Sequence, residues 1–356
     1  MRFEGAGDYR YVIMQALMKY QNKKGAVQIR EINDPVPLDG WVKIGVDSAS
    51  ICGSDIHIYD NTIKIRTRPP VVIGHEFSGV IVETGKNVKS FKVGDRVVSE
   101  TTIKTCGFCS HCHSGKINMC PNREVLGYYY DGSFAKYLCV PESKLHIIPD
   151  NVDFDSAALV EPLACCVHGV IERTRIGLED RVAISGPGCV GLLSLQLAIS
   201  VGARVSILGT ESDKTRLEMA EYLGADHIIC VDRNDPLDSL NRITSGEGVD
   251  VFLDCSGAGD AIDLGLRALR PHGYYTQIGF LGRPVTVDYE LIAYKELNVT
   301  GAISQLRSSW ALSLELLERG KVKTLPLITE RMSLKEWKSG FEKVRRKDGL
   351  KIILKP

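Results

Sequence analysis

The feature that most constrains the fold is a regular alternation of apolar strands and helices between residues 181 and 302. Short runs rich in Val, Ile and Leu are followed by helical stretches of about 10–15 residues, which is typical of a parallel sheet with helices on both faces. The predicted strands are 181–185, 204–208, 227–231, 249–255, 274–280 and 297–302. The predicted helices are 189–203, 214–225 and 261–269. We therefore predict an α/β protein with a doubly wound sheet.

A glycine-rich turn follows the first of these strands. Gly186, Gly188 and Gly191 form the pattern G-x-G-x-x-G, directly before an apolar helix. Cys189 and Val190 fill its variable positions. Such glycines allow a tight turn, the approach of a pyrophosphate, and close packing of helix on strand, while the helix N-terminus favours phosphate charge. We expect a Rossmann dinucleotide site; the alternative is a glycine-rich turn that binds nothing.

The end of the second strand bears on the choice between NAD and NADP. An acidic residue about 20 positions after the glycines holds the ribose hydroxyls of NAD, whereas an arginine meets the 2′-phosphate of NADP. Glu211 follows Gly209 here and would repel a phosphate, while Arg216 lies further on, in the predicted helix. The sequence favours NAD as cofactor, with NADP as the alternative.

The segment 41–149 has a different pattern. Its short apolar runs, separated by Gly, Asp and Pro, are typical of a β-rich lobe, and the last helices and strand of the chain are expected to return to it. We predict one domain from residues 1–160 and 303–356 and a second from 161–302, with a helix over 156–174. Residues 1–13 precede the strand pattern and are interpreted as a loosely ordered extension or a start-site artefact.

Four cysteines lie close together in the β-rich segment, within a lobe predicted over 104–122. They are Cys106, Cys109, Cys112 and Cys120, with the spacing C-x2-C-x2-C-x7-C. Four thiolates can surround one tetrahedral Zn²⁺ and fill every position, which makes such a site structural. The alternative is a coincidence of four free thiols.

A second set of potential metal ligands is dispersed along the chain. These residues are Cys52, His75, Glu76 and Glu161. Together they offer the ligands of a catalytic zinc, which keeps one position open. Each also has a structural interpretation: a core thiol, a satisfied core histidine, or a carboxylate at a helix N-terminus. No local spacing connects them, so the pattern alone does not establish this site.

The composition excludes several functions. Lys+Arg and Asp+Glu both number 44, so the formal net charge is zero, and neither a nucleic-acid partner nor a nucleic-acid-binding zinc ribbon is expected. No apolar stretch is long enough to predict a membrane span, and the N-terminus lacks a signal-peptide pattern. Eleven cysteines in a chain of 356 residues indicate free or metal-bound thiols in a reducing cytoplasm.

The order of these motifs resembles the zinc-dependent medium-chain dehydrogenases, most closely their sorbitol (polyol) and L-threonine dehydrogenase branch. The stretch 74–97 (GHEFSGVIVETGKNVKSFKVGDRV), the four-cysteine lobe, the sequence EPLA and the glycine pattern occur in the order of that family. The resemblance runs from about residue 16 to the end. It implies a GroES-like catalytic domain, a Rossmann coenzyme domain and a cleft between them.

The resemblance also implies roles for individual residues. The implied ligands of a catalytic zinc are Cys52, His75 and either Glu76 or Glu161. With zinc as Lewis acid, Ser54 would take a proton from the substrate hydroxyl, and His57 would pass it outward by way of the coenzyme ribose. The implied coenzyme contacts are Gly188, Val190, Glu211, Arg216, Ile278, Gly279, Ala302 and Ser304.

The implied reaction is the oxidation of a secondary alcohol of a polyol or sugar alcohol by NAD, in a homotetramer or homodimer with two Zn²⁺ per chain. Two positions depart from sorbitol dehydrogenases: Ile58 replaces a Tyr, and Ser304-Gln305 replaces an Arg-Tyr pair. L-Threonine 3-dehydrogenase and an NADP-dependent carbonyl reductase of the same family are alternatives. A catalytically idle protein that binds zinc and nucleotide is the alternative from a different class.

Overall fold

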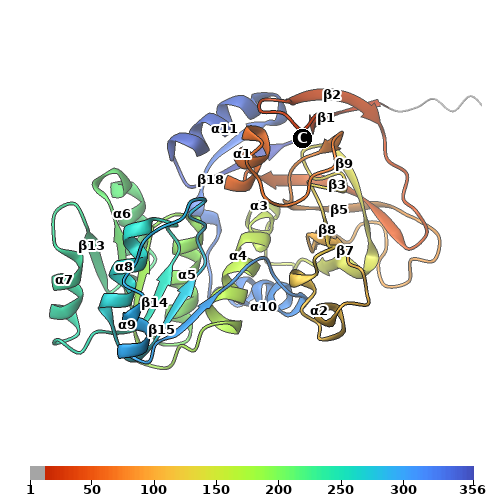
Figure 1. The fold of residues 1–356 in the computed structure, drawn as a ribbon. Coiled ribbons are helices and arrows are strands. Elements are labelled where there is room, and N and C mark those ends of the chain that lie inside the picture. Colours follow the sequence, from red (N-terminus) through yellow and green to blue (C-terminus); the bar gives the residue numbers. More distant parts are fainter. Residues whose placement is uncertain (1–12) are drawn as a thin grey trace, which may run out of the picture.

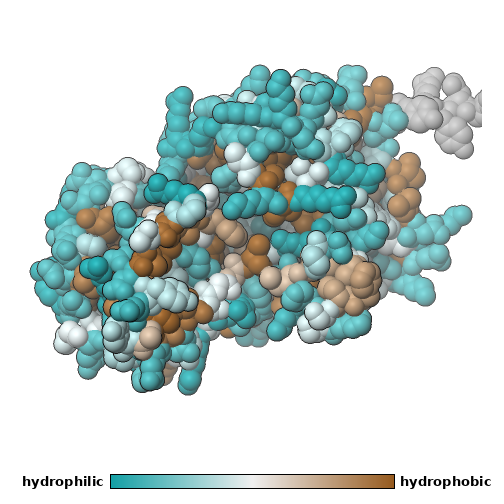
Figure 2. Space-filling model, in the orientation of Figure 1, coloured by the Kyte–Doolittle hydropathy of each residue, from teal (hydrophilic) through white to brown (hydrophobic). Residues whose placement is uncertain are grey.

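The computed structural model describes residues 13–356. The interpretation of residues 1–13 as an extension therefore falls outside the described residues, except for Ile13. Figure 1 shows two lobes side by side, a β-rich lobe at the right and an α/β lobe at the left. Hydrophilic side chains cover most of the face in Figure 2, with hydrophobic groups also visible over the middle, where the lobes meet. Within the described range, no helix is both long and apolar enough to cross a membrane.

The first lobe is built around a seven-stranded sheet in the order β10-β6-β5-β3-β18-β17, with β9 paired to β3. A three-stranded sheet, β2-β1-β4, and the β7-β8 pair complete it. Its strands are β1 Ile13–Lys19, β2 Val27–Asn33, β3 Trp41–Ser50, β4 Val71–Val72, β5 Glu76–Thr84, β6 Arg96–Ser99, β7 Thr102–Lys104, β8 Glu124–Val125, β9 Tyr137–Pro141, β10 Leu145–Ile147, β17 Ile328–Ser333 and β18 Lys351–Lys355.

Strand β18 carries the distal part of the chain into the first lobe. It pairs antiparallel with β3, where Leu354 faces Ala49, and parallel with β17 on its other side. Its residues 351–354 are buried. Helix α11 (Trp337–Arg346) covers this end of the sheet and packs against α1 (Gly53–Asp60), with the Trp337 and Phe341 rings beside Tyr59. The short helix α2 (Ser110–His113) lies in the cysteine lobe.

The second lobe confirms the predicted doubly wound sheet. Its six strands are all parallel, in the order β13-β12-β11-β14-β15-β16. The strands are β11 Arg181–Ser185, β12 Arg204–Gly209, β13 His227–Cys230, β14 Val249–Asp254, β15 Leu269–Gln277 and β16 Asn298–Gly301. The helices are α5 Cys189–Ser200, α6 Lys214–Tyr222, α7 Pro236–Ile243, α8 Gly259–Ala268 and α9 Glu290–Tyr294. Strand order reverses between β11 and β14, and ligands of such sheets bind at this switch point.

The helix expected over 156–174 is divided into shorter pieces. Helix α3 (Phe154–Ala158) ends before Leu159, whose ψ of 8° interrupts the helix, and α4 (Val160–Val167) continues into a π-helical turn, His168–Glu172. Pro162 explains the interruption, because it has no N–H to donate to the carbonyl four residues earlier.

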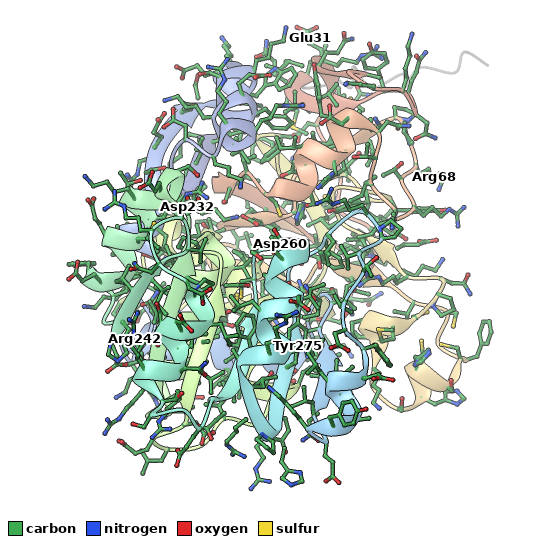
Figure 3. All side chains as sticks on the ribbon, turned by 60° about the vertical axis from the view of Figure 1, so that its left-hand side comes forward. Glu31, Arg68, Asp232, Arg242, Asp260 and Tyr275 are labelled. Atoms are coloured by element: carbon green, nitrogen blue, oxygen red, sulfur yellow. The ribbon has the colours of Figure 1, made fainter. Side chains whose placement is uncertain are left out.

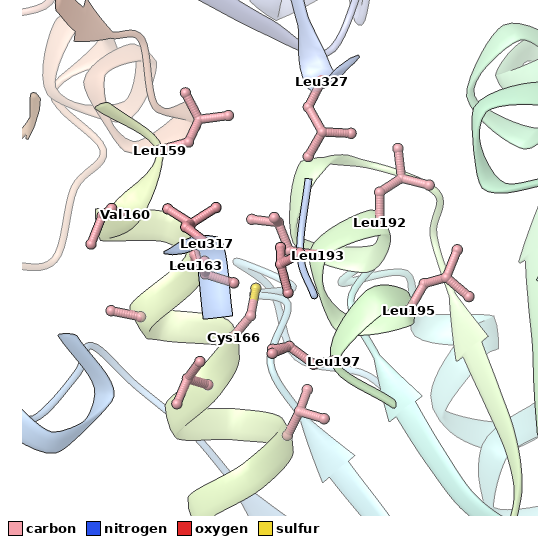
Figure 4. Close-up of a cluster of buried hydrophobic side chains, with 14 of the residues drawn as sticks. Leu159, Val160, Leu163, Cys166, Leu192, Leu193, Leu195, Leu197, Leu317 and Leu327 are labelled. Atoms are coloured by element: carbon pink, nitrogen blue, oxygen red, sulfur yellow. The ribbon is translucent and has the colours of Figure 1, made fainter. Parts of the chain in front are cut away.

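A continuous hydrophobic core joins the two lobes. Helix α4 packs against α5 of the sheet lobe and against α10 (Arg307–Glu318). Figure 4 shows Leu163 and Cys166 on α4 facing Leu193 and Leu197 on α5, with Leu317 of α10 close by. All five side chains are buried. This core holds α4, and with it Glu161, in a fixed position at the junction.

Candidate active site between the lobes

The cysteine cluster has the geometry of a closed metal site. The Cys112 sulfur lies 3.9 Å from the Cys106 sulfur and 3.5 Å from the Cys109 sulfur. The sulfurs of Cys106 and Cys120 are 3.6 Å apart. Tetrahedral zinc with Zn–S bonds of about 2.3 Å separates its sulfurs by about 3.8 Å, so the four thiols fit this metal. All four are free of disulfides, and the Cys106 N–H points at the Cys120 sulfur at 3.5 Å.

A second group of possible ligands forms where β3 meets β5. One ligand atom from each of Cys52, His75 and Glu76 lies within 4.8 Å of the other two. Strand pairing explains this convergence, because Ser50 at the end of β3 faces Glu76 at the start of β5. Cys52 lies two residues after the end of β3 and His75 directly precedes β5, so the ladder places both at one edge of the sheet. A thiolate, an imidazole and a carboxylate are a suitable donor set for a zinc with an open position.

Glu76 also forms a buried ion pair that the sequence did not indicate. Both of its oxygens accept hydrogen bonds from the Lys351 ammonium, at 2.7 and 2.6 Å, and both side chains are buried. Burial disfavours the charged lysine, but the adjacent carboxylate outweighs it and raises the pKa of Lys351. The lysine comes from β18, 275 residues after Glu76, so no local motif could have signalled it.

Glu161 lies next to this group but outside the three-residue cluster. Its Oε1 accepts a hydrogen bond from the Gln305 amide at 2.9 Å, and the same amide donates to Thr101 at 3.0 Å. The Cys165 thiol is 3.8 Å from Glu161. Burial, together with the charge of Glu76, raises the pKa of Glu161 to about 7. Which of the two glutamates binds a resting zinc stays a prediction, as does the ligand set itself.

The two residues of the predicted proton relay lie on the same helix in different environments. The Ser54 hydroxyl is 3.2 Å from His75 Nε2, within the ligand cluster. His57 is exposed, and its Nδ1 bonds the Thr62 hydroxyl at 3.0 Å. Helix α1 therefore leads from the cluster to the surface, and the relay between these residues remains a prediction.

Two further residues of the cluster were missed at the sequence level. Asp55 is completely buried; it accepts the Cys52 N–H at 2.9 Å, and its other oxygen lies 3.5 Å from His75 Nδ1. A carboxylate behind a histidine ligand fixes the ring orientation. Tyr128 is buried with its ring 5.3 Å from that of His75, and burial raises its pKa. The position of Asp55, three residues after Cys52, was a sequence signal that could have identified it as part of the cluster. No sequence signal pointed to Tyr128.

The glycine turn opens α5 at the centre of the parallel sheet. Gly186 has a φ of 89°, and a side chain on Gly191 would collide with the Gly186 carbonyl at 1.9 Å. A Cβ on Gly188, the N-cap of α5, would meet nothing within 4 Å. The first and third glycines are therefore needed for packing, whereas the second faces open space before a helix N-terminus. This arrangement suits a pyrophosphate.

The other residues of the glycine turn are partly buried. Cys189 begins α5, and burial raises its pKa to about 12, so its thiol stays protonated at neutral pH. The Val190 carbonyl faces the Cys166 thiol at 3.5 Å. Both belong to the helix that packs on α4, and their contact with a coenzyme stays a prediction.

Glu211 and Arg216 follow β12 but face different partners. The Glu211 carboxylate is half exposed and pairs with Arg233 at 2.7 Å, while its N–H donates to Asp232, which is labelled in Figure 3. The Arg216 guanidinium donates to the carbonyls of Lys347 and Gly349 in the first lobe, at 2.9 and 2.7 Å. Glu211 is thus the side chain available at the strand end, and Arg216 connects the lobes.

The remaining predicted coenzyme residues lie at the ends of β15 and β16. Ile278, Gly279 and Ala302 line a cavity of about 590 Å³, and the N–H groups of Ile278 and Gly279 both donate to the Asp254 carbonyl. Ser304 has a φ of 58° and donates its hydroxyl to Gln305. Asp254 was not predicted. It is fully buried and accepts hydrogen bonds from Ser185, Ser256 and Gln277; the Tyr275 hydroxyl (Figure 3) is 3.4 Å away.

Comparison with family models decides the relationship. Residues 38–150 match the alcohol dehydrogenase GroES-like domain, and residues 189–319 match the zinc-binding dehydrogenase domain. The sorbitol dehydrogenase of Halalkalibacterium halodurans is 41% identical over 96% of this chain and 99% of its own. The chain belongs to the zinc-dependent medium-chain alcohol dehydrogenase family. It is an oxidoreductase, as the resemblance implied.

Other members of this alcohol dehydrogenase family are similar over almost the whole chain. A D-arabitol-phosphate dehydrogenase of Enterococcus avium is 40% identical over 91% of this chain and 92% of its own. An L-threonine 3-dehydrogenase of Bacillus velezensis is 37% identical over 96% of this chain and 99% of its own.

Solved structures of the family extend the comparison to the coenzyme. A zinc-binding dehydrogenase from Sinorhizobium meliloti bound to NADP superposes with a TM-score of 0.89 at 29% identity, over 97% of this chain and 100% of its own. An alcohol dehydrogenase from Escherichia coli in complex with NADH superposes with a TM-score of 0.87 at 28% identity, over 97% of this chain and 99% of its own. Zinc and a nicotinamide nucleotide are accordingly the cofactors of this dehydrogenase.

Proposed function

We propose that this protein is an NAD-dependent polyol dehydrogenase, which transfers a hydride from a secondary alcohol of a polyol or sugar alcohol to NAD and yields the ketone. The observation that carries the proposal is the convergence of Cys52, His75 and Glu76 with Ser54 beside the histidine. An open metal position is needed for catalysis but not for stability. The sorbitol and D-arabitol-phosphate dehydrogenases at 41% and 40% identity support a polyol substrate.

In the proposed reaction a catalytic zinc supplies Lewis acidity and the nicotinamide accepts the hydride. Ser54 removes the proton of the substrate hydroxyl, and His57, near the surface end of the same helix, passes it toward solvent. Proton transfer of this kind contributes roughly 10²–10⁴-fold to the rate. Asp55 orients the His75 ring. The buried Lys351 and Gln305 hold the carboxylates of Glu76 and Glu161 in place.

NAD is the proposed coenzyme because of the end of β12. A phosphate on the adenosine ribose would approach the half-exposed Glu211 carboxylate, which disfavours NADP. Arg216, the nearest arginine on α6, already donates to two backbone carbonyls. An NADP-dependent carbonyl reductase is the alternative. A comparison of initial rates with NAD and with NADP distinguishes the two.

L-Threonine 3-dehydrogenase is the second candidate. Its support is the 37% identity to such an enzyme over 96% of the chain, and the two departures from sorbitol dehydrogenases, at Ile58 and at the pair Ser304-Gln305. Ser304 stands at the arginine position of that pair and carries no charge, and Gln305, at the tyrosine position, is buried with both amide hydrogens engaged.

The organisation of the molecule is also part of the proposal. We assign residues 1–160 and 303–356 to the catalytic domain and 161–302 to the coenzyme domain. A homodimer or homotetramer is supported by the edge strand β16, where Val299 is 47% exposed and Tyr294 nearby is 79% exposed. Eleven free cysteines support a reducing compartment, the cytoplasm.

The test is a set of initial rates with NAD and NADP against polyols, sugar-alcohol phosphates and L-threonine, with zinc content measured on the same sample. Oxidation of a polyol or its phosphate with NAD supports the proposal, with about two zincs per chain. Turnover of L-threonine alone assigns the protein to the second candidate. About one zinc per chain with no turnover on any substrate would favour the idle binder.

A further inference from the structure

Asn118 connects the cysteine lobe with the segment that crosses between the two lobes of the molecule. It lies in a short 3₁₀ turn, Ile117–Met119, two residues before Cys120. Its side-chain Nδ2 donates to the Ile303 carbonyl at 3.0 Å, 185 residues further along the chain. Figure 1 shows this crossing segment, between β16 and α10, beside the part of the lobe that carries α2. Asn118 is buried, so water does not readily replace this bond.

The same amide begins a chain of hydrogen bonds that ends at α10. Asn118 Nδ2 lies 3.3 Å from His168 Nε2, and this ring nitrogen is the acceptor because an amide nitrogen only donates. The histidine therefore carries its proton on Nδ1, which donates to Glu172 at 2.6 Å. Glu172 also accepts the hydroxyls of Ser308 and Ser309, at 2.7 and 3.1 Å. The π-helical turn after α4 is thus held between the cysteine lobe and α10.

The elements held in this way form one wall of the cavity of about 590 Å³ at the ends of β15 and β16. Asn118 and His168 line it together with the predicted coenzyme contacts Ile278 and Ala302. A Cβ on Gly169 would lie 2.9 Å from Ile278 Cδ1 and 3.4 Å from the Ala302 Cβ, so the π-helical turn packs directly against both. Such turns occur frequently at functional sites. A shift of this turn would move the cavity wall.

The position of the cavity fits the nicotinamide half of a dinucleotide. The glycine turn follows β11, and the strand order β11-β14-β15-β16 places the cavity two to three strands away, roughly 10–15 Å. The intervening loops touch, because a Cβ on Gly186 would meet Ser256 and one on Gly257 would meet the Phe280 carbonyl. A pyrophosphate at the glycine turn would therefore send one half of the coenzyme along these strand ends into the cavity. The adenosine half would extend the other way, past β12 toward Glu211.

We propose that Asn118 is a positioning residue for the coenzyme, which holds the nicotinamide end of the cavity in its binding geometry through Ile303 and His168. This inference rests on the coenzyme site of the proposed function and gives the cysteine lobe a second task. The Ile303 carbonyl stands between Ala302 and Ser304, both predicted coenzyme contacts. Loss of the Asn118 donor would leave this carbonyl and His168 Nε2 without that partner, which favours a shift of both elements.

The experiment compares the binding of NADH and of ADP-ribose, which lacks the nicotinamide, to the zinc-loaded protein. Nicotinamide fluorescence measures the first and calorimetry the second. Asn118→Leu should raise the Kd of NADH by about 3- to 10-fold, the range for a lost hydrogen bond, and change the Kd of ADP-ribose by less than about twofold. A general loss of structure would weaken both ligands, so the difference between them reports the nicotinamide end.

Asn151→Leu is the matched control. Asn151 also donates its amide to a distant backbone carbonyl, that of Glu318 at 2.8 Å, but it is exposed and does not line the cavity. Its replacement should leave both Kd values unchanged. Asn118→Ala removes the same donors as Asn118→Leu without added bulk, so it should reproduce the loss and keeps the test available if the leucine variant does not fold. Unaltered zinc content of the Asn118 variants shows that the cysteine lobe is intact.

The outcomes separate this inference from the proposed function. A wild type that binds NADH, with no loss or with equal losses for the two ligands in the Asn118 variants, overturns the inference and leaves the polyol dehydrogenase in place. A wild type that binds NADH but oxidises no polyol refutes the proposed substrate, while a selective loss of NADH affinity would still support the role of Asn118. A wild type that binds neither ligand refutes the coenzyme site and the inference with it.

Discussion

The two metal-binding regions of this dehydrogenase are assembled in opposite ways. The cysteine lobe takes its four thiols from residues 106–120, and a short hairpin, β7 with β8, closes it. The ligand cluster at the lobe junction takes its residues from the ends of β3 and β5 and is supported by side chains from α4, β18 and the segment before α10. Local spacing determines the first region, and the folded framework determines the second.

This difference separates stability from chemistry. A site filled by four neighbouring thiolates needs little of the remaining structure, but it has no free position for a substrate. A site at the junction of two lobes can keep a position open because distant elements hold its ligands apart. If the two regions are as independent as their construction suggests, a change in one of them should leave the other intact.

The largest effect is expected from Cys52→Ser. Loss of a ligand should remove the catalytic metal and with it several kcal/mol of transition-state stabilisation, which corresponds to a fall in kcat/KM of roughly 10³-fold or more. Zinc content should drop from about two to about one per chain, with little change in melting temperature. Wild-type turnover in this variant would contradict the assignment of the ligand cluster.

Cys109→Ser should reduce stability more than activity. Loss of one thiolate ligand in the cysteine lobe should lower the free energy of unfolding by about 3–5 kcal/mol, a fraction of the roughly 10–16 kcal/mol of zinc binding in isolated zinc-finger peptides. Thermal melting of the zinc-loaded protein measures this loss. The control is Cys230→Ser, which changes a cysteine outside both groups. An unchanged melting temperature for Cys109→Ser would argue against a structural metal.

Lys351→Met tests the framework of the ligand cluster. It leaves Glu76 as a buried charge without its lysine, which typically costs about 3–5 kcal/mol of stability. The double variant with Glu76→Gln should recover much of that loss, as urea denaturation of the metal-free proteins would measure. The matched control is Arg319→Met, because the Arg319–Glu315 pair is exposed and contributes at most about 1 kcal/mol. Equal losses in both single variants would refute a special role for the buried pair.

The smallest effect is expected from Gln305→Leu. This change removes the donor to Glu161 and should lower kcat by about 10-fold, because a hydrogen bond to a carboxylate contributes about 1.5–3 kcal/mol. Thr101→Val removes only the other contact of the same amide and should cost about two- to threefold. If both variants lose activity equally, Gln305 supports the fold and does not position the glutamate.

The sequence predicted those features that arise from neighbouring residues. The alternating strands and helices of the sheet lobe and the glycine turn at Gly186 follow local rules, and the structure contains them. The spacing of Cys106 and Cys109 likewise predicted the cysteine cluster. The single helix expected over 156–174 was wrong because Pro162 interrupts it.

What the sequence did not indicate are contacts between segments far apart in the chain. Lys351 reaches Glu76 only because β18 inserts beside β3, and Gln305 reaches Glu161 only because the chain crosses between the lobes before α10. The dispersed ligands themselves were proposed from a family resemblance, and the β3–β5 register supplies the physical reason for their meeting.

The ion pair between Glu76 and Lys351 has a consequence for the order of events during synthesis. Its partners are 275 residues apart, so at about 5–20 residues per second a ribosome adds the lysine roughly 15–55 s after the glutamate. The four thiols of the cysteine lobe emerge within about 1–3 s of one another. We therefore expect the nascent chain to take up its structural metal early, and to become competent for the catalytic one only when translation has nearly passed β18.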